Sequence, residues 1–206
     1  MIKFLLEACV ETLEECIYAQ HAGADRLELC SHLELDGLTP SLELVRQVLQ
    51  AVDIPVMVMI RPRGGDFVYT QDELDQMKAE IRQMKALNVA GLVFGALTPE
   101  GQIDRAATSR LAQEASPFPV TFHKAIDAAP DPVAALKTLL DIGGIQRVLT
   151  SGGAPTAWEG QEDLRQMVAS AGGQIQIIAA SKVTASNRDQ IQQATGAVEL
   201  HGRRIV

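Results

Sequence analysis

Short apolar runs alternate with longer segments of helical period along the whole chain, and this alternation limits the fold more than any other feature. Eight runs resemble buried strands: 2–9, 26–30, 54–60, 90–96, 118–123, 146–151, 174–180 and 197–202. Seven segments between them have helical period: 11–23, 41–52, 71–88, 104–116, 131–143, 158–172 and 184–195. In the third of these, Leu74, Met77 and Ile81 recur at helical spacing, which predicts one apolar helix face.

Strict alternation of strand and helix predicts an α/β protein with a parallel sheet and helices outside it. Eight strand–helix units favour a closed (β/α)8 TIM barrel. A doubly wound open sheet is the competing fold, but it needs no eighth strand, and no GxGxxG motif follows the first run. Because no linker or low-complexity segment interrupts the pattern, we expect one domain over residues 1–206.

The sequence ends at Val206, a few residues after the eighth predicted strand. We therefore expect a barrel that lacks the eighth outer helix. The flank over the first and eighth strands would then be bare or covered by another copy of the chain, so we expect a homo-oligomer, a dimer or higher.

Charge and cysteine content exclude several classes of function. The formal net charge is -8, and no block of Lys and Arg occurs, which argues against nucleic-acid and anionic-membrane partners. No apolar run approaches the roughly 20 residues of a membrane span, and the N-terminus lacks the pattern of a signal peptide. Three cysteines, an odd number, favour reduced thiols and a cytoplasmic location.

Polar and sulfur-containing residues fall at the carboxyl ends of the predicted strands, which form the functional face of a TIM barrel. They are Glu7, Cys9, Glu28, Cys30, Arg61, Arg63, His123, Thr150, Ser151 and His201. Buried charges require partners, so we expect Arg61 to pair with Glu7 and Glu28. This trio forms either a ligand site or a purely structural ion network.

His123 and Asp127 form a candidate proton-transfer pair on the opposite side of the barrel mouth. His201 lies near the end of the sequence, and we interpret it as a structural histidine. Within the stretch MIRPRGGDFVYT, residues 59–70, we expect the two glycines to let the loop turn so that Asp66 holds Arg63.

Six segments carry a family resemblance: GADRLELC, GLTPSLELV, MIRPRGGDFVYT, GLVFGAL, VTFHKAID and RVLTSGG. In this order they resemble segments of the CutC family of copper homeostasis proteins, over nearly the whole chain. The resemblance implies a TIM barrel, a cytoplasmic location and a part in copper homeostasis, with copper(I) as a possible ligand. The family's glycine-rich stretch after the seventh strand reads AASKV here, residues 179–183, so Lys182 would have to supply charge to any phosphate site.

Two functions remain open. Copper(I) prefers thiolate and thioether ligands, and Cys9, Cys30 and Met59 would lie on three successive strands at one end of the barrel. The alternative is an enzyme that acts on a small anionic molecule by acid/base chemistry. Its candidate catalytic residues are Glu7, Glu28, Arg61, His123 and Asp127. Its candidate ligand-binding residues are Arg63, Asp66, Thr150, Ser151 and Lys182.

Two known enzyme classes fit less well. The HxH opening of metal-dependent amidohydrolases is absent from the first strand. A Schiff-base lysine is absent from the sixth strand, although Lys124 and Lys182 leave this chemistry open. A non-catalytic binding or scaffold protein has no positive feature in the sequence.

Overall fold

Eight parallel strands close into a barrel in chain order in the computed structural model, which describes residues 4–206. The strands are β1 (Leu5–Val10), β2 (Arg26–Leu29), β3 (Val56–Met59), β4 (Gly91–Phe94), β5 (Val120–Phe122), β6 (Arg147–Thr150), β7 (Gln176–Ala179) and β8 (Glu199–Gly202). Hydrogen bonds between β1 and β8 close the ring. The predicted TIM barrel is thus confirmed.

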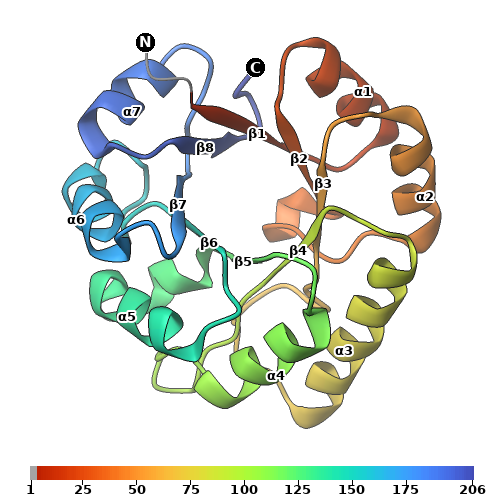
Figure 1. Cartoon of the computed structure of the whole chain (residues 1–206), viewed down its shortest axis with the longest axis horizontal. Coiled ribbons are helices and arrows are strands. Elements are labelled where there is room, and N and C mark those ends of the chain that lie inside the picture. Colours follow the sequence, from red (N-terminus) through yellow and green to blue (C-terminus); the bar gives the residue numbers. More distant parts are fainter. Residues whose placement is uncertain (1–3) are drawn as a thin grey trace.

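Seven α-helices form the outer ring around these strands (Figure 1). They are α1 (Leu13–His21), α2 (Leu42–Ala51), α3 (Gln71–Ala86), α4 (Arg105–Ala115), α5 (Pro132–Ile142), α6 (Gln161–Ala171) and α7 (Arg188–Thr195). Two short 3-10 helices, η1 (Leu33–Leu35) and η2 (Lys124–Ala128), follow β2 and β5 at the barrel mouth. Within residues 4–206 no helix follows β8, as expected, and the end of the chain lies between α7 and α1 in Figure 1.

Local capping explains where most helices begin. The Thr70 hydroxyl accepts a hydrogen bond from the Glu73 amide, and the Glu73 carboxylate accepts one from the Thr70 amide, forming a capping box at α3. Asp131 caps α5, with Pro132 at its first position. Helix α7 begins at Arg188, later than predicted, because the Asn187 side chain holds the Thr184 amide in a turn.

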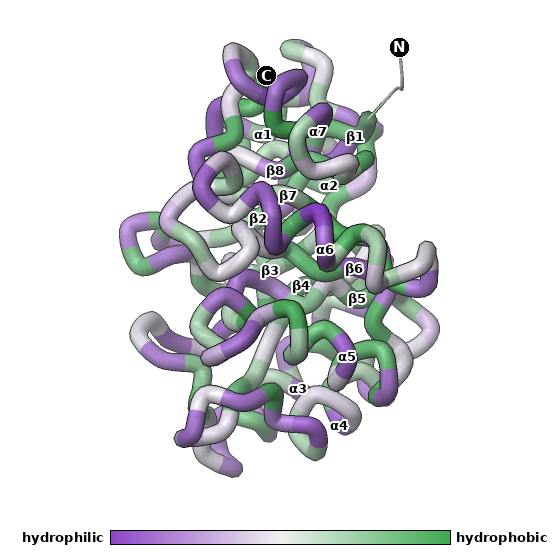
Figure 2. The backbone as a smooth tube through the Cα atoms, turned by 90° about the vertical axis from the view of Figure 1, so that its left-hand side faces the viewer, coloured by the Kyte–Doolittle hydropathy of each residue, from purple (hydrophilic) through white to green (hydrophobic). Residues whose placement is uncertain are grey.

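Two layers of side chains fill the molecule. The larger layer lies between strands and helices and includes Phe94, Phe122 and Ile126, all fully buried. In the backbone tube of Figure 2, β3 and β4 accordingly have the hydrophobic colour, and much of the hydrophilic colour lies on the outer turns. No helix among residues 4–206 is both long enough and apolar enough to cross a bilayer. The first predicted strand covers residues 2–9, and its first two residues lie outside the part of the chain that the structure describes.

The inner layer divides by strand into an apolar part and a charged part. Met57, Met59 and Val93 on β3 and β4 pack with Cys30 in one small apolar cluster. Arg26, Glu7 and Glu199 form a charged part on the adjoining strands β2, β1 and β8. The charged strands are neighbours in the barrel, so each buried carboxylate has a cation within reach.

Candidate functional site

A cavity of about 960 Å³ opens at the carboxyl ends of the strands. This volume suits a small organic molecule. Among the predicted site residues, those that line it are Cys9, Glu28, Cys30, Met59, Arg61, His123, Asp127 and Lys182. Those that do not are Glu7, Arg63, Asp66, Thr150 and Ser151. The barrel mouth therefore gathers most of the predicted residues around one space.

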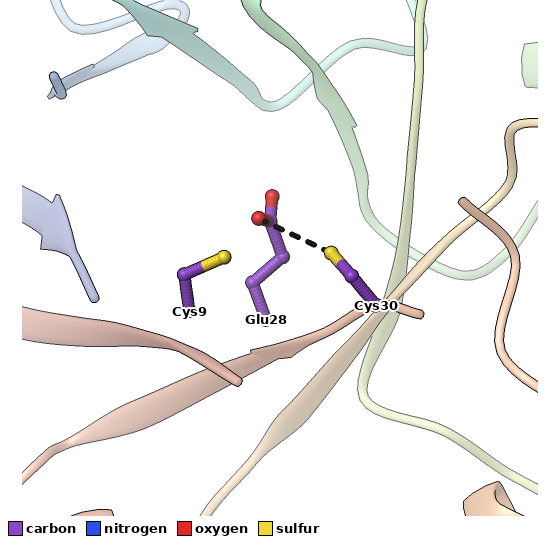
Figure 3. A group of neighbouring side chains, drawn as sticks. All are labelled: Cys9, Glu28 and Cys30. Carbon is purple, nitrogen blue, oxygen red and sulfur yellow. Dashed lines mark hydrogen bonds between the residues drawn. The ribbon is translucent and has the colours of Figure 1, made fainter. Parts of the chain in front are cut away.

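Cys9, Glu28, Cys30 and Met59 make up what we call the sulfur side of the mouth. Cys9 pairs with Glu28 across β1 and β2, and the Glu28 carboxylate extends between the two sulfur atoms (Figure 3). The Cys30 thiol donates a hydrogen bond to Glu28 Oε2 over 3.7 Å. One ligand atom from each of Cys9, Glu28 and Cys30 lies within 4.8 Å of the other two.

This spacing is compatible with a metal ion. Metal–thiolate bonds are about 2.3 Å long, so two ligands on opposite sides of an ion are about 4.6 Å apart. Met59 is buried in the same apolar cluster as Cys30, together with Met57, which is not among the predicted site residues. The cluster surrounds the two thiols with thioether and aliphatic groups on their β3 and β4 side.

Glu7 lies beneath the two cysteines and is held by two cations. Arg26 Nε and His201 Nδ1 both hydrogen-bond to its carboxylate, the latter at 2.8 Å. Burial would raise the pKa of Glu7, but these hydrogen bonds and the Arg26 charge lower it to about 2. Arg26 also donates to Glu199, so its own charge is compensated twice.

His201 connects this pair to the sulfur side. Its Nε2 lies 3.6 Å from Glu28 Oε2. Burial would lower the pKa of His201, but the Glu28 charge and hydrogen bonds to Cys9 and Glu7 raise it well above its usual value. Contact with the Cys30 thiol and with the His201 cation lowers the pKa of Cys9 to about 5, although burial raises it. Burial raises the pKa of Glu28 to about 8.

The expected pairing of Arg61 with Glu7 and Glu28 is wrong. Its guanidinium donates to the carbonyl oxygens of Leu35, Asp36, Gly37 and Gly65, at 2.9–3.3 Å. Arg61 follows the end of β3, so its side chain reaches the loops above the mouth instead of the barrel interior. Arg61 therefore ties two loops together and packs over the Phe67 ring, 4.7 Å from its centre.

Arg63 lies outside the cavity, and its expected contact with Asp66 is present at 3.0 Å. Arg63 Nε also donates to Glu73 at 2.5 Å, which links the loop to the start of α3. The Arg63 guanidinium, about one third exposed, thus has two carboxylate partners. A ligand role for Arg63 and Asp66 stays a prediction.

His123, Lys124, Ser181 and Lys182 make up what we call the histidine side of the mouth. The His123 ring lies 5.0 Å from the Phe67 ring, and its Nδ1 accepts the Ala125 amide at 3.2 Å. Burial and the Arg61 charge lower the pKa of His123 to about 3. No hydrogen bond among the described residues joins His123 to Asp127, and their proton-transfer role stays a prediction.

Asp127 is occupied by the loop after β6. It accepts hydrogen bonds from the Thr150 and Ser151 hydroxyls and from the Ser151 and Gly153 amides. Lys124 Nζ lies 3.1 Å from Asp127 Oδ2 and donates to Ser181 Oγ at 2.5 Å. Thr150 and Ser151 thus position Asp127 and, through it, Lys124.

Several central residues were missed or undervalued in the sequence. His201 was interpreted as structural, and it lies between both carboxylates and a thiol. Arg26 was overlooked, although it shares the inward parity of Glu28 and Cys30 on the same strand. Lys124 and Ser181 follow strand ends, where a barrel places its functional groups.

Comparison with known proteins identifies the family of the chain. The CutC family profile matches residues 4–206. The chain belongs to the CutC family. The human copper homeostasis protein cutC homolog is 46% identical over 198 residues, which is 96% of this chain and 72% of the human protein. A family protein CutC from Glaesserella parasuis is 43% identical over 95% of this chain and 80% of its own.

Solved structures support the same membership. The putative copper homeostasis protein CutC from Streptococcus agalactiae superposes with a TM-score of 0.93 at 34% identity. The match covers 98% of this CutC-family chain and all of the other. A putative deoxyribose-phosphate aldolase from Coccidioides immitis reaches a TM-score of 0.71 at 14% identity, which shows a shared barrel and nothing about chemistry.

Proposed function

We propose that this CutC-family protein of copper homeostasis acts in the cytoplasm by binding copper(I) at the sulfur side of the barrel mouth. The observation that carries the proposal is the approach of Cys9, Glu28 and Cys30, whose ligand atoms lie within 4.8 Å of one another. Thiolates are the donors that copper(I) prefers, and Met59 adds a thioether nearby.

The surroundings favour a thiolate at this place. The lowered pKa of Cys9, about 5, makes it the more readily ionised thiol at neutral pH. A metal ion needs deprotonated cysteines, and contact with Cys9 and burial raise the pKa of Cys30 well above its usual value, so binding at both thiols releases the Cys30 proton. The His201 cation stabilises the negative charge of a thiolate at Cys9.

Competition for copper(I) between the protein and a chromogenic chelator tests the proposal. The Cys9→Ser and Cys30→Ser double variant should lose affinity by more than the about 10- to 100-fold that follows loss of a supporting group. Cys16→Ser is the matched control, because Cys16 is buried on the inner face of helix α1 and does not line the cavity. Equal affinity in the double variant and in wild type would refute the site.

An enzymatic function is the second candidate, favoured by the volume of the cavity. About 960 Å³ is far more than a single ion fills. A small anionic substrate would meet Glu28 and His123 as possible acid/base groups. Turnover that survives removal of copper and of both thiols would support this second function over the first.

A further inference from the structure

The histidine side of the mouth contains an unsatisfied hydrogen-bond donor. His123 is 3% exposed, lines the cavity, and its Nε2 has no hydrogen-bond partner. Because Nδ1 accepts the Ala125 amide, the neutral ring carries its proton on Nε2. A buried donor without a partner is unfavourable. An acceptor oxygen from a ligand would supply the missing hydrogen bond to Nε2.

The same side carries positive charge that no described carboxylate neutralises. Arg61 is 2% exposed and is bound by carbonyl oxygens, with Nε left without a partner. Lys182 forms no ion pair within residues 4–206, and it lines the cavity. The charge of Lys124 is neutralised by Asp127. Lys124 also donates a hydrogen bond to the Ser181 hydroxyl, and this bond affects what Ser181 can do.

Ser181 is prepared to donate a hydrogen bond. Its oxygen accepts from the Lys124 ammonium at 2.5 Å, and no described group accepts the Ser181 hydroxyl proton. An ammonium donor at the oxygen strengthens the hydroxyl as a donor in turn. The hydroxyl therefore suits an anionic oxygen next to it in the cavity.

The loop that carries Ser181 and Lys182 is held in an unfavourable backbone conformation. Their φ angles are 77° and 56°, in the left-handed region that glycine prefers. Four contacts fix it: Lys124 on the Ser181 hydroxyl, Ala157 on the Ser181 carbonyl, Asn187 on the Lys182 carbonyl, and Thr184 in a bridge with Arg204. Two adjacent non-glycine residues thus adopt a backbone conformation that is less strained for glycine. Such strain is concentrated at binding sites.

We propose that the histidine side binds a small organic oxyanion, with its charged group between Ser181 and Lys182 and a second oxygen on the Nε2–H of His123. The ligand class is a carboxylate or phosphate that also carries a carbonyl or hydroxyl oxygen. The cavity is large enough to hold this ligand beside the sulfur side. The low pKa of His123 agrees with a neutral donor role at physiological pH.

The test uses metal-free wild-type protein and two probes, pyruvate for a carboxylate and dihydroxyacetone phosphate for a phosphate. Nitrogen-15 NMR of labelled histidine should show a neutral His123 with its proton on Nε2, and saturation with a probe should shift this signal while affinity is measured by calorimetry. Inorganic phosphate, which lacks the second oxygen, should bind more weakly and leave the His123 signal in place.

Variants then separate binding from folding. Lys182→Gln and Ser181→Ala should each weaken the better probe by about tenfold or more, as expected for a charge-assisted hydrogen bond. Lys137→Gln, an exposed lysine on α5, removes the same charge and should change nothing. Lys182→Gly should weaken binding equally while the melting temperature rises, because glycine relieves the left-handed strain.

The Cys9→Ser and Cys30→Ser double variant should keep probe affinity within about twofold, which makes this result independent of copper. Failure of both probes to shift the His123 signal, or equal loss of affinity in Lys137→Gln and Lys182→Gln, would overturn the proposal. A melting temperature that falls in Lys182→Gly would also contradict the assigned strain.

Discussion

Two buried histidines face one cavity from opposite sides of the barrel mouth, and their surroundings drive them to opposite charge states. His201, on β8, lies between Glu7, Glu28 and Cys9, and its pKa is raised well above the usual value. His123, after β5, lies beside Arg61 and aromatic rings, and its pKa falls to about 3. In the same barrel, His201 is thus a cation next to the thiols, and His123 is a neutral hydrogen-bond donor next to cations of the loops.

The difference follows from which elements supply each side. Strand residues build the sulfur side, where adjacent strands bring carboxylates and cations into register. Loop residues build the histidine side, where backbone carbonyls and hydroxyls solvate the cations. Disturbing the strands should therefore damage one side, and disturbing the loops the other.

The largest effect should come from removing the cation beneath the sulfur side. Arg26→Met leaves Glu7 and Glu199 without their shared partner, and breaking a buried pair in this way costs about 3–5 kcal/mol of unfolding free energy. Urea denaturation gives the value. Arg82→Met is the control, since Arg82 is mostly exposed and its pair with Glu114 is worth about 1 kcal/mol or less. Equal losses of unfolding free energy in Arg26→Met and Arg82→Met would mean that the buried ion pairs of Arg26 stabilise the fold no more than an exposed pair does.

A smaller effect should follow from crowding the histidine side. A methyl group at Gly95 would lie 2.7 Å from His123 Nδ1 and 3.0 Å from Phe122 Cε1, so both buried rings must move. We expect Gly95→Ala to lose about 1–3 kcal/mol of unfolding free energy and to weaken oxyanion probes without changing copper(I) affinity. Gly64→Ala, whose methyl would meet Leu35 at an ordinary 3.4 Å, is the control. A change in copper(I) affinity instead would contradict the separation of the two sides.

A third effect concerns pH and builds up gradually over several pH units. His123 has a pKa of about 3 in the folded chain and about 6.5 when unfolded, so between these values the unfolded chain binds the extra proton. Unfolding free energy should therefore fall on acidification below about pH 6.5, with His123 contributing about 1.4 kcal/mol per pH unit. Denaturation curves of wild type and His123→Phe across this range give the difference. Parallel pH profiles would show that His123 is not held neutral.

His201 should contribute with the opposite sign. Its raised pKa means that its stabilising contribution is complete below about pH 6.5 and is lost as pH rises through the folded value. The same curves extended to alkaline pH, with His201→Phe as the partner variant, compare the two histidines directly.

The sequence was sufficient for the barrel because eight apolar runs and their helices repeat in strict order. It also placed most residues of the mouth, since strand ends are visible as polar residues after apolar runs. It could not show that Arg61 turns to the loops, because that depends on how far β3 extends and where η1 lies. Residues 26, 28 and 30 alternate along one strand, so their side chains share a face, and this pattern could have predicted that Arg26 points into the barrel with Glu28.

The histidine side was harder to predict because its contacts join loops that are distant in the chain. Lys124 and Ser181 are 57 residues apart, and only the closed barrel brings them together. The replacement of glycine-rich sequence by AASKV suggested a weakened phosphate site. The backbone keeps the glycine-type conformation at Ser181 and Lys182 all the same.

X-ray absorption spectroscopy of the copper(I)-loaded protein tests the central claim most directly, since it identifies the atoms bound to the metal. We predict sulfur scatterers in the first coordination shell of wild type, and their loss in the Cys9→Ser and Cys30→Ser double variant. A shell of nitrogen and oxygen alone in wild type, or an unchanged sulfur signal in the double variant, would contradict the account.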